Sequence, residues 1–242
     1  MDKLLYTAAS GANRVMEAQA IRANNLANLN TNGFRADLER VQAHALGGSG
    51  LNTRVMAQTQ QSGANLRAGE LNATGRTLDV AIQGDGWLTV QTGDGEAYTR
   101  AGAMVLDADG FMTIDGRAVL GLDGPIQLPE YRELNIGEDG TISLLPAEGG
   151  LIEEVGQLKL VNPEGNTLVK GTDGLMRLRD GEIAPQDEAV QLASGFLEGS
   201  NVTAVEELLA SMSLSRQFEL QVKLMKSAET LAQSGNRLLR DA

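Results

Sequence analysis

Glycine is almost confined to the middle of this chain. Of the 29 glycines in 242 residues, only Gly11, Gly33 and Gly235 lie outside residues 47–199. A glycine inside a helix costs about 1 kcal/mol relative to alanine, so the glycine-poor ends favour long helices and the middle does not. The pattern predicts a helix at each end and a turn-rich region of strands between them.

The amino-terminal segment has the spacing of an amphipathic helix of about six turns. Its apolar stripe consists of Leu4, Leu5, Ala8, Ala12, Val15, Met16, Ala18 and Ile21. Alanine dominates this stripe, so a partner can approach closely while each contact buries little surface, and such a helix needs a partner to be stable in water. We expect it to end among the asparagines of residues 24–32, because asparagine tolerates the left-handed conformation and its amide competes for backbone hydrogen bonds.

The carboxy-terminal segment predicts a second and longer helix. Neither proline nor glycine occurs between Val202 and Ser234, so a helix starting near Ser200 or Thr203 can run for about thirty residues, or roughly 45 Å. Its predicted single stripe consists of Val205, Leu208, Leu209, Met212, Phe218, Val222, Met225, Ala228, Ala232 and Leu239. Two helices that each need a partner most simply pack on each other as a coiled pair.

The central region is predicted to be an antiparallel sandwich or barrel-like domain. The dipeptide Asp-Gly occurs eight times between Asp85 and Gly181, and it is the dipeptide that two-residue hairpin loops favour. Between these turns lie short apolar or alternating runs of strand length, such as Trp87–Gln91 and Met112–Ile114. The predicted fold class is therefore α+β, with long N- and C-terminal helices packed as a coiled pair and a central antiparallel β-rich domain.

Four segments follow from these patterns. Residues 1–34 form the amino-terminal helix, residues 35–72 an extended connector with some β pairing, residues 73–195 the central β-rich domain, and residues 196–242 the carboxy-terminal helix.

Composition argues against several classes of function. The formal net charge of −12 disfavours nucleic acid as a partner, because binding a polyanion requires a basic face. The absence of cysteine excludes disulfides, thiolate metal sites and thiol nucleophiles. His44 is the only histidine, and we interpret it as an exposed or locally bonded side chain. The run Leu4–Asn13 is too weakly apolar for a signal-peptide core or a membrane span.

The remaining groups that could support chemistry have simpler interpretations. Asp107, Asp109 and Asp115 could suggest a calcium loop, but the terminal glutamate of such a loop is missing and hairpin turns explain them better. Trp87 and Tyr98 could stack on sugars, although they are more simply core anchors. We therefore predict no catalytic, cofactor-binding or metal-ligating residue, and no enzyme activity.

Both ends of the chain carry motifs that resemble a known family. Ala23–Phe34 reads ANNLANLNTNGF, which resembles the amino-terminal signature of the bacterial flagellar rod and hook axial proteins. Leu197–Val202, followed by Arg216–Glu219, resembles the carboxy-terminal signature of that family. In the middle, Thr77–Trp87 and Tyr98–Gly102 are similar to the central domain that rod and hook proteins share. The resemblance covers essentially the whole chain and is strongest to the proximal rod members.

The resemblance implies a structural subunit of the proximal rod in the flagellar basal body. Such a subunit would pass through the flagellar type III export apparatus and polymerise in the periplasm with proximal and distal rod subunits and with copies of itself, without nucleic acid and without membrane insertion. The alternative is a free β-rich module that binds a glycan.

We expect the assembly interface to lie on the terminal segments. Its predicted residues are Leu4, Leu5, Ala8, Ala12, Val15, Asn24, Asn25, Leu26, Asn28, Asn30, Gly33, Phe34, Asn201, Val205, Leu208, Met212, Phe218, Val222 and Met225.

Overall fold

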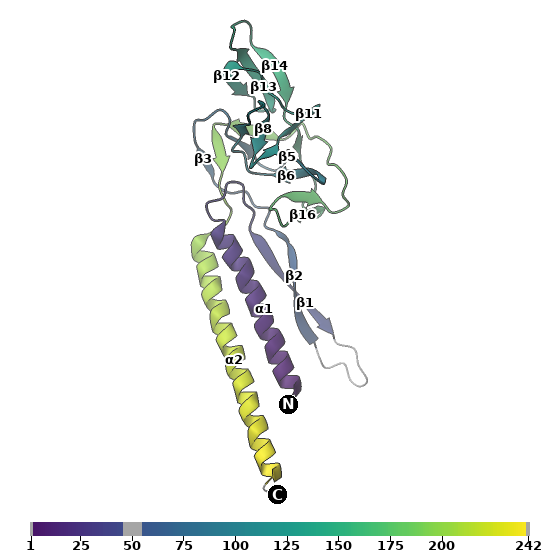
Figure 1. The fold of residues 1–242 in the computed structure, drawn as a ribbon, viewed down its shortest axis with the longest axis vertical. Helices are drawn as coiled ribbons and strands as arrows, with labels where there is room; N and C mark the ends of the chain where they lie inside the picture. Colours follow the sequence, from purple (N-terminus) through teal and green to yellow (C-terminus); the bar gives the residue numbers. More distant parts are fainter. Residues whose placement is uncertain (1, 46–54, 241–242) are drawn as a thin grey trace. The chain divides into compact units, whose positions relative to one another are not determined.

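A computed structural model describes the backbone of residues 2–45 and 55–240, and the side chains of residues 6–39, 63–234 and Arg237 (Figure 1). The chain divides into two compact units. The helix unit comprises Met1–Ala27, Asp37–Gly63 and Thr203–Ala242, and the strand unit comprises Asn28–Ala36 and Ala64–Val202.

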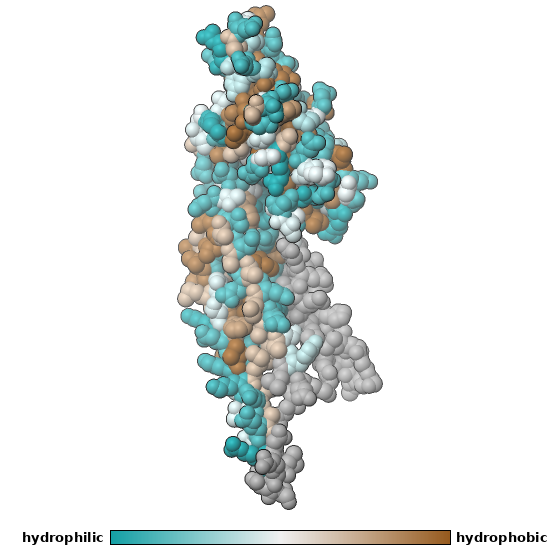
Figure 2. Space-filling view, viewed as in Figure 1, coloured by the Kyte–Doolittle hydropathy of each residue, from teal (hydrophilic) through white to brown (hydrophobic). Residues whose placement is uncertain are grey.

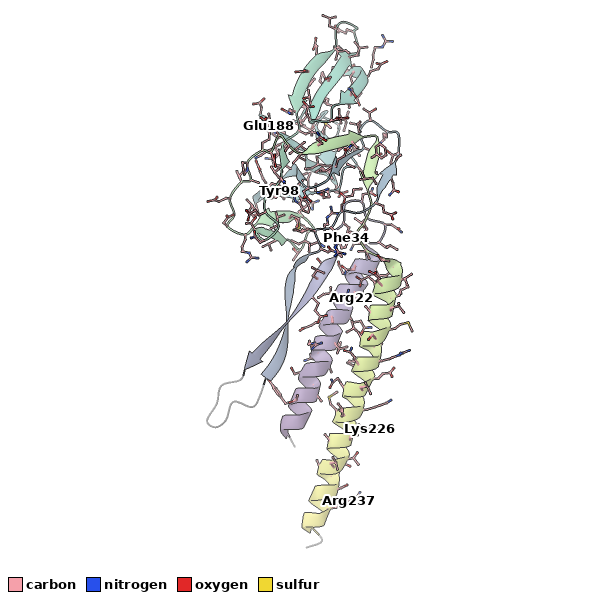
Figure 3. The ribbon with its side chains drawn as sticks, turned by 180° about the vertical axis from the view of Figure 1, so that it is seen from behind. Arg22, Phe34, Tyr98, Glu188, Lys226 and Arg237 are labelled. Atoms are coloured by element: carbon pink, nitrogen blue, oxygen red, sulfur yellow. The ribbon has the colours of Figure 1, made fainter. Side chains whose placement is uncertain are left out.

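The helix unit contains the two ends of the chain and one hairpin. Helix α1 spans Asp2–Ala27 and helix α2 spans Ala204–Arg240, while strands β1 (Asp37–Ala45) and β2 (Val55–Ala64) pair in a two-stranded sheet. Figures 1 and 3 show α1 lying between α2 and this hairpin. As predicted, α1 ends within the asparagine-rich segment. Helix α2 extends further than the thirty residues expected.

The strand unit is built from short antiparallel strands. They are β3 (Leu71–Ala73), β4 (Val80–Gln83), β5 (Trp87–Thr92), β6 (Gly95–Thr99), β7 (Val105–Leu106), β8 (Met112–Ile114), β9 (Arg117–Ala118), β10 (Leu120–Gly121), β11 (Gly124–Pro125), β12 (Tyr131–Ile136), β13 (Thr141–Pro146), β14 (Glu153–Gln157), β15 (Leu160–Val161), β16 (Leu168–Lys170), β17 (Met176–Leu178), β18 (Gln191–Ser194) and β19 (Phe196–Glu198). The largest sheet has the order β15-β5-β6-β17-β16. Smaller sheets are β12-β13-β14, β7-β8-β9, β18-β4, β19-β3 and β10-β11. The α+β class with a central antiparallel β region is confirmed.

One of the eight aspartate-glycine dipeptides has the backbone geometry of the predicted two-residue loop, since Asp115 is the only aspartate among the described residues with positive φ. Asp115 and Gly116 form the two-residue loop between β8 and β9, and both have positive φ, at 51° and 76°. This is the backbone geometry for which the dipeptide is favoured. Asp107 stabilises the turn in which it lies, because its Oδ1 accepts hydrogen bonds from the backbone N–H of Asp109 at 3.0 Å and of Phe111 at 2.8 Å. The hairpin interpretation of these aspartates therefore holds, and the calcium loop does not.

Two hydrophobic clusters hold the strand unit together. The larger joins buried side chains from many strands, among them Leu88, Met112, Ile142 and Leu192. The smaller is centred on Trp87 and Tyr98. Both of these aromatic side chains are buried, so the alternative that they form a sugar-stacking platform is wrong. The Tyr98 hydroxyl, placed in Figure 3, accepts a hydrogen bond of 2.8 Å from the backbone N–H of Ala184.

The predicted connector, residues 35–72, contains β1, β2 and the start of β3. His44 lies in β1, and its side chain is outside the described residues.

Candidate assembly surface

A seam of small and polar residues joins α1 to α2. On α1 the buried residues Ala8, Ala12, Val15, Ala18 and Asn25 recur at steps of three, four or seven. On α2 one row of buried and half-buried residues follows alternating steps of four and three; it consists of Glu207, Ser211, Leu214, Phe218, Gln221, Met225 and Ala228. Gly11 faces this row, because a β-carbon built there would lie 3.1 Å from the Gln221 side chain. The small residues of α1 therefore let the two helices approach closely.

A second apolar face of α2 is exposed. Val205 is 64% exposed and Met212 is 56% exposed, although both are large apolar side chains. The full outer face consists of Val205, Leu209, Met212, Leu220, Leu224 and Leu231. At about 100° per residue, these positions lie on the side of the helix roughly opposite the seam. Figure 2 shows brown apolar residues on the visible side of α2.

The single stripe predicted for α2 was therefore wrong. Phe218, Met225 and Ala228 belong to the seam, whereas Val205 and Met212 belong to the outer face, with Leu208 and Val222 also exposed. Apolar residues occupy so much of the circumference of α2 that spacing alone could not tell which apolar face meets α1. Burial against α1 separates them.

Polar side chains set the register of the seam. Arg22 Nη1 of α1 donates to both carboxylate oxygens of Glu207 at 3.2 and 3.3 Å, and Asn25 Nδ2 donates to Glu207 Oε1 at 3.2 Å (Figure 3 labels Arg22). Further along, Gln19 Nε2 lies 3.5 Å from Ser215 Oγ. Because residues late in α1 meet residues early in α2, the helices are antiparallel. Buried polar pairs of this kind specify one register among several.

Asn25 also holds the hairpin against α1. Its Oδ1 accepts a hydrogen bond from the backbone N–H of Asp37 at 2.8 Å, and its Nδ2 donates to the carbonyl oxygen of the same residue at 3.1 Å. The side-chain amide thus makes the two hydrogen bonds with Asp37 that the backbone of a neighbouring strand would otherwise make at the start of β1. Arg14 and Glu39 form a longer ion pair of 4.0 Å between the same two elements. Asn25 is fully buried, so its contacts are made within the helix unit.

The structure distributes the other predicted interface residues over both units. Ala8, Ala12 and Val15 are buried in the helix unit, Leu26 is half-buried and Asn24 is exposed. Asn28, Gly33, Phe34 and Asn201 are half-buried in the strand unit, where Asn30 is exposed. Leu4 and Leu5 lie in α1, but their side chains are outside the described residues.

The two terminal signatures meet inside the strand unit. The backbone N–H of Gly33 donates to the carbonyl oxygen of Glu198 at 2.7 Å. Asn201 accepts from the N–H of Ala36 at 2.8 Å through Oδ1, and its Nδ2 donates to the carbonyl oxygens of Asn65 at 2.7 Å and Arg67 at 2.9 Å. One amide side chain therefore joins three stretches of backbone that are far apart in the sequence.

Gly33 is required where these segments meet. Its φ is +68°, and a β-carbon at this position would lie 2.2 Å from backbone atoms of Arg100 and Ala101. Lys170 contacts the two residues after Gly33. Its Nζ donates a hydrogen bond to the carbonyl oxygen of Arg35 at 2.7 Å and lies 4.0 Å from the centre of the Phe34 ring.

A buried group of charges lies beside this meeting point, and we call Arg35, Arg100, Glu198 and Trp87 the charge cluster. Glu198 is fully buried, and its two carboxylate oxygens lie 2.7 Å from Arg35 Nη2 and 3.0 Å from Arg100 Nη1. Both guanidinium carbons lie over the Trp87 ring, at 5.7 Å for Arg35 and 5.4 Å for Arg100. Burial lowers the pKa of Arg100 from its ordinary value, Glu198 opposes that shift and Arg35 adds to it. Sequence reasoning missed these charged residues, although Arg35 directly follows one signature motif and Glu198 lies within the other.

Among the described residues, no group of three or more histidine, aspartate or glutamate side chains could hold a metal ion. Within the same residues, neither helix has a stretch long and apolar enough to cross a membrane.

Comparison with known proteins assigns all three parts of the chain. Residues 5–35 match the family described as flagella basal body rod protein, residues 81–144 the flagellar hook protein FlgE/F/G D1 domain, and residues 193–238 the flagellar basal body rod FlgEFG protein C-terminal region. The chain is 42% identical over 248 residues to the flagellar basal-body rod protein FlgF of Escherichia coli K12, covering 99% of both chains. This chain belongs to the flagellar basal-body rod protein family.

Further relatives agree with this assignment. FlgF of Salmonella typhimurium LT2 is also 42% identical over 248 residues, with 99% of each chain covered. FlgG of Bacillus subtilis 168 is 31% identical over 257 residues, covering 96% of this chain and 97% of the relative. Within the rod family the chain is most like FlgF, and it is a structural subunit of the basal-body rod, where other rod and hook proteins are its partners. The glycan-binding alternative is not supported.

The matched segments contain the contacts described above. The amino-terminal match includes Asn25, Gly33 and Arg35, and the carboxy-terminal match includes Glu198 and Glu207. Each terminal match thus supplies one partner to the helix seam and another to the charge cluster.

Proposed function

We propose that this rod subunit polymerises through its terminal helices, in the proximal part of the rod, with other rod proteins and with copies of itself. The observation that carries this proposal is the exposed outer face of α2. Six large apolar side chains on that face have no cover from α1, and burying one such side chain is worth about 1.5–3 kcal/mol. A neighbouring subunit that covers the outer face would gain this free energy.

In this proposal α1 and α2 form a coiled pair. Steps of three, four and seven residues on both sides of the seam support this, because that spacing keeps two helices in continuous contact as they wind about each other. The seam is rich in alanine, glycine and polar residues, so it buries less apolar surface than an ordinary helix pair. The largest apolar residues of α2 are thereby left available to neighbours.

The same proposal assigns a different role to each segment of the chain. Residues 1–34 and 196–242 form the axial core, residues 35–72 connect it, and the β-rich domain of residues 73–195 faces outward. The acidic excess of the chain lies in that domain and would keep the exterior of the polymer soluble. The contact is heterologous, since the outer face of one subunit meets a different surface of the next, and contacts of this kind that do not close produce a helical polymer.

Two further properties complete the proposal. The subunit reaches the periplasm through the flagellar type III export apparatus, and it has no catalytic role. The relatives quoted above are named as flagellar basal-body rod proteins, which supports the second point.

Charged substitutions on the outer face test this proposal. We expect Met212→Asp and Leu220→Asp to fold normally, because both side chains are exposed, and to lose rod assembly, because a buried unpaired charge is strongly unfavourable. The matched control is Gln217→Asp, which adds the same charge to an exposed polar position of the same helix. Circular dichroism would check the helix content, and recovery of motility in cells lacking the native subunit would measure assembly. Normal motility with both variants would contradict the proposal.

A further inference from the structure

Glu198 gathers four parts of the strand unit around one carboxylate. Its Oε1 accepts a hydrogen bond of 2.7 Å from the backbone N–H of Gly69 and lies 2.7 Å from Arg35 Nη2. Its Oε2 accepts a hydrogen bond of 3.0 Å from Arg100 Nη1. The backbone of Glu198 belongs to β19, so the segments around residues 35, 69, 100 and 198 all meet at this side chain.

The charges in this group do not balance. Two guanidinium groups and one carboxylate are buried together, and both guanidinium groups face the same Trp87 ring. Without the carboxylate, two like charges would share one desolvated space, which is strongly unfavourable in a protein interior. The tryptophan ring attracts each cation but contributes only about 0.5–2 kcal/mol per contact.

The two arginines are not held equally. Arg100 Nη2 donates to the carbonyl oxygen of Gly84 at 2.7 Å in addition to its hydrogen bond with Glu198. In the described part of the chain, no nitrogen of the Arg35 guanidinium has a hydrogen-bond partner, so its side chain is held by the ion pair and by Trp87. Loss of the Glu198 charge should therefore release Arg35 and leave Arg100 in place.

We propose that Glu198 is a charge latch: its negative charge is what allows the segment Asn28–Ala36 to dock in the strand unit against the repulsion between Arg35 and Arg100. This proposal is separate from polymerisation and can fail or succeed independently of it. Glu198 also comes long after both arginines in the chain. A chain synthesised from its amino terminus therefore carries the two repelling cations first, and docking of Asn28–Ala36 waits for the carboxy-terminal signature.

Three full-length variants test the latch. Glu198→Gln keeps the shape of the side chain and leaves two unbalanced cations. Arg35→Gln leaves the neutral pair of Arg100 and Glu198. The double variant Glu198→Gln/Arg35→Gln lacks the ion pair but has only one cation. If repulsion between the two cations dominates, amide exchange should be slower in the double variant than in Glu198→Gln. If only lost contacts matter, exchange in the double variant should be no slower.

Amide hydrogen exchange is the measurement. We expect Glu198→Gln to speed exchange at least tenfold at the amides of Gly33 and Ala36, whereas the amide of Ile142 in the β12-β13-β14 sheet is unchanged. Arg35→Gln should stay close to the wild-type rate, and the double variant should exchange more slowly than Glu198→Gln. Fluorescence of Trp87, the only tryptophan, gives a second readout, because its quenching by acrylamide should follow the same order.

Two results would overturn the latch. One is wild-type exchange in Glu198→Gln. The other is exchange in the double variant that equals or exceeds that of Glu198→Gln, because removing one of two repelling cations would then have brought no relief. Should Glu198→Gln fail to fold, circular dichroism of the double variant decides the matter: a folded double variant supports the latch, and an unfolded one contradicts it.

Discussion

Arg22 of α1 lies 3.2 Å from Glu207 of α2, and the two residues are 185 positions apart in the sequence. This contact, with Asn25 as the second donor to the same carboxylate, ties the end of the first helix to the beginning of the last. On its α1 side the seam is made mainly of small side chains, so shape alone would allow neighbouring registers. The polar group is what distinguishes one register from the next.

Replacing Glu207 tests this role. We expect Glu207→Ala to destabilise the helix unit by about 1–3 kcal/mol, because the buried Asn25 amide loses an acceptor and Arg22 loses its counter-charge. Spin labels on exposed positions of the two helices would show a broader distance distribution, since the register is no longer fixed. Chemical unfolding would give the free energy.

The neighbouring carboxylate supplies the control for that variant. Glu206 is exposed on the same turn of α2. Glu206→Ala should therefore change the unfolding free energy by no more than about a few tenths of a kcal/mol and should leave the distance distribution unchanged. Equal effects from the two substitutions would show that Glu207 has no special part in the seam.

Two glycines with nearly the same φ allow the cost of a left-handed backbone to be distinguished from the cost of a steric clash. Gly33 and Gly75 have φ of +68° and +72°, but a β-carbon meets backbone atoms at 2.2 Å at Gly33 and open space at Gly75. We expect Gly75→Ala to cost about 1–2 kcal/mol, the ordinary cost of the left-handed conformation. Gly33→Ala should cost at least about 2 kcal/mol more, because Arg100 and Ala101 must move.

Urea unfolding of both glycine variants, each compared with the wild type, measures this difference. Similar losses of stability at the two positions would mean that the backbone around Gly33 accommodates a methyl group, and the close approach of the signature segment to Arg100 would then not matter for folding.

The ion pair between Asp173 and Arg177 predicts a pH dependence. Hydrogen bonding from Arg177 lowers the pKa of Asp173 to about 2, below the value of about 3.9 for an unfolded chain. A carboxyl group whose pKa is lowered by folding adds stability above the unfolded value and loses it as the pH falls toward the folded value. The contribution of Asp173 should therefore be complete above about pH 4 and disappear between about pH 4 and 2.

Arg177→Gln should raise the pKa of Asp173 toward its ordinary value and flatten the loss of stability over that range. Nuclear magnetic resonance titration of the Asp173 carboxyl carbon measures this shift. Asp139 is the internal control, because its lowered pKa comes mainly from hydrogen bonds with Thr141 and should not respond to Arg177→Gln. An unchanged titration of Asp173 in the variant would contradict the assignment.

Local features of the fold were predictable because their causes lie in adjacent residues. The Asp115–Gly116 loop follows from the positive φ that both positions adopt, and α1 ends within the asparagine-rich segment. Strand β8 occupies the predicted run of residues 112–114. The family was also readable from the two terminal motifs. In each case a short stretch of sequence carries the whole signal.

The charge cluster and the two faces of α2 were not predictable in this way. Arg35, Arg100 and Glu198 meet only after three distant segments have folded together, and nothing adjacent to any of them marks it as buried. Likewise, Val205 and Phe218 lie about 140° apart around α2, but their spacing does not say which of the two faces α1 covers.

The amino-acid order by itself determined where this chain is helical, where it turns and to which family it belongs, because backbone preference and motif are local properties. Tertiary structure alone decided which apolar face of α2 turns inward and which charges are buried together. Burial depends on what approaches a side chain from elsewhere in the molecule, and no spacing along the chain contains that information.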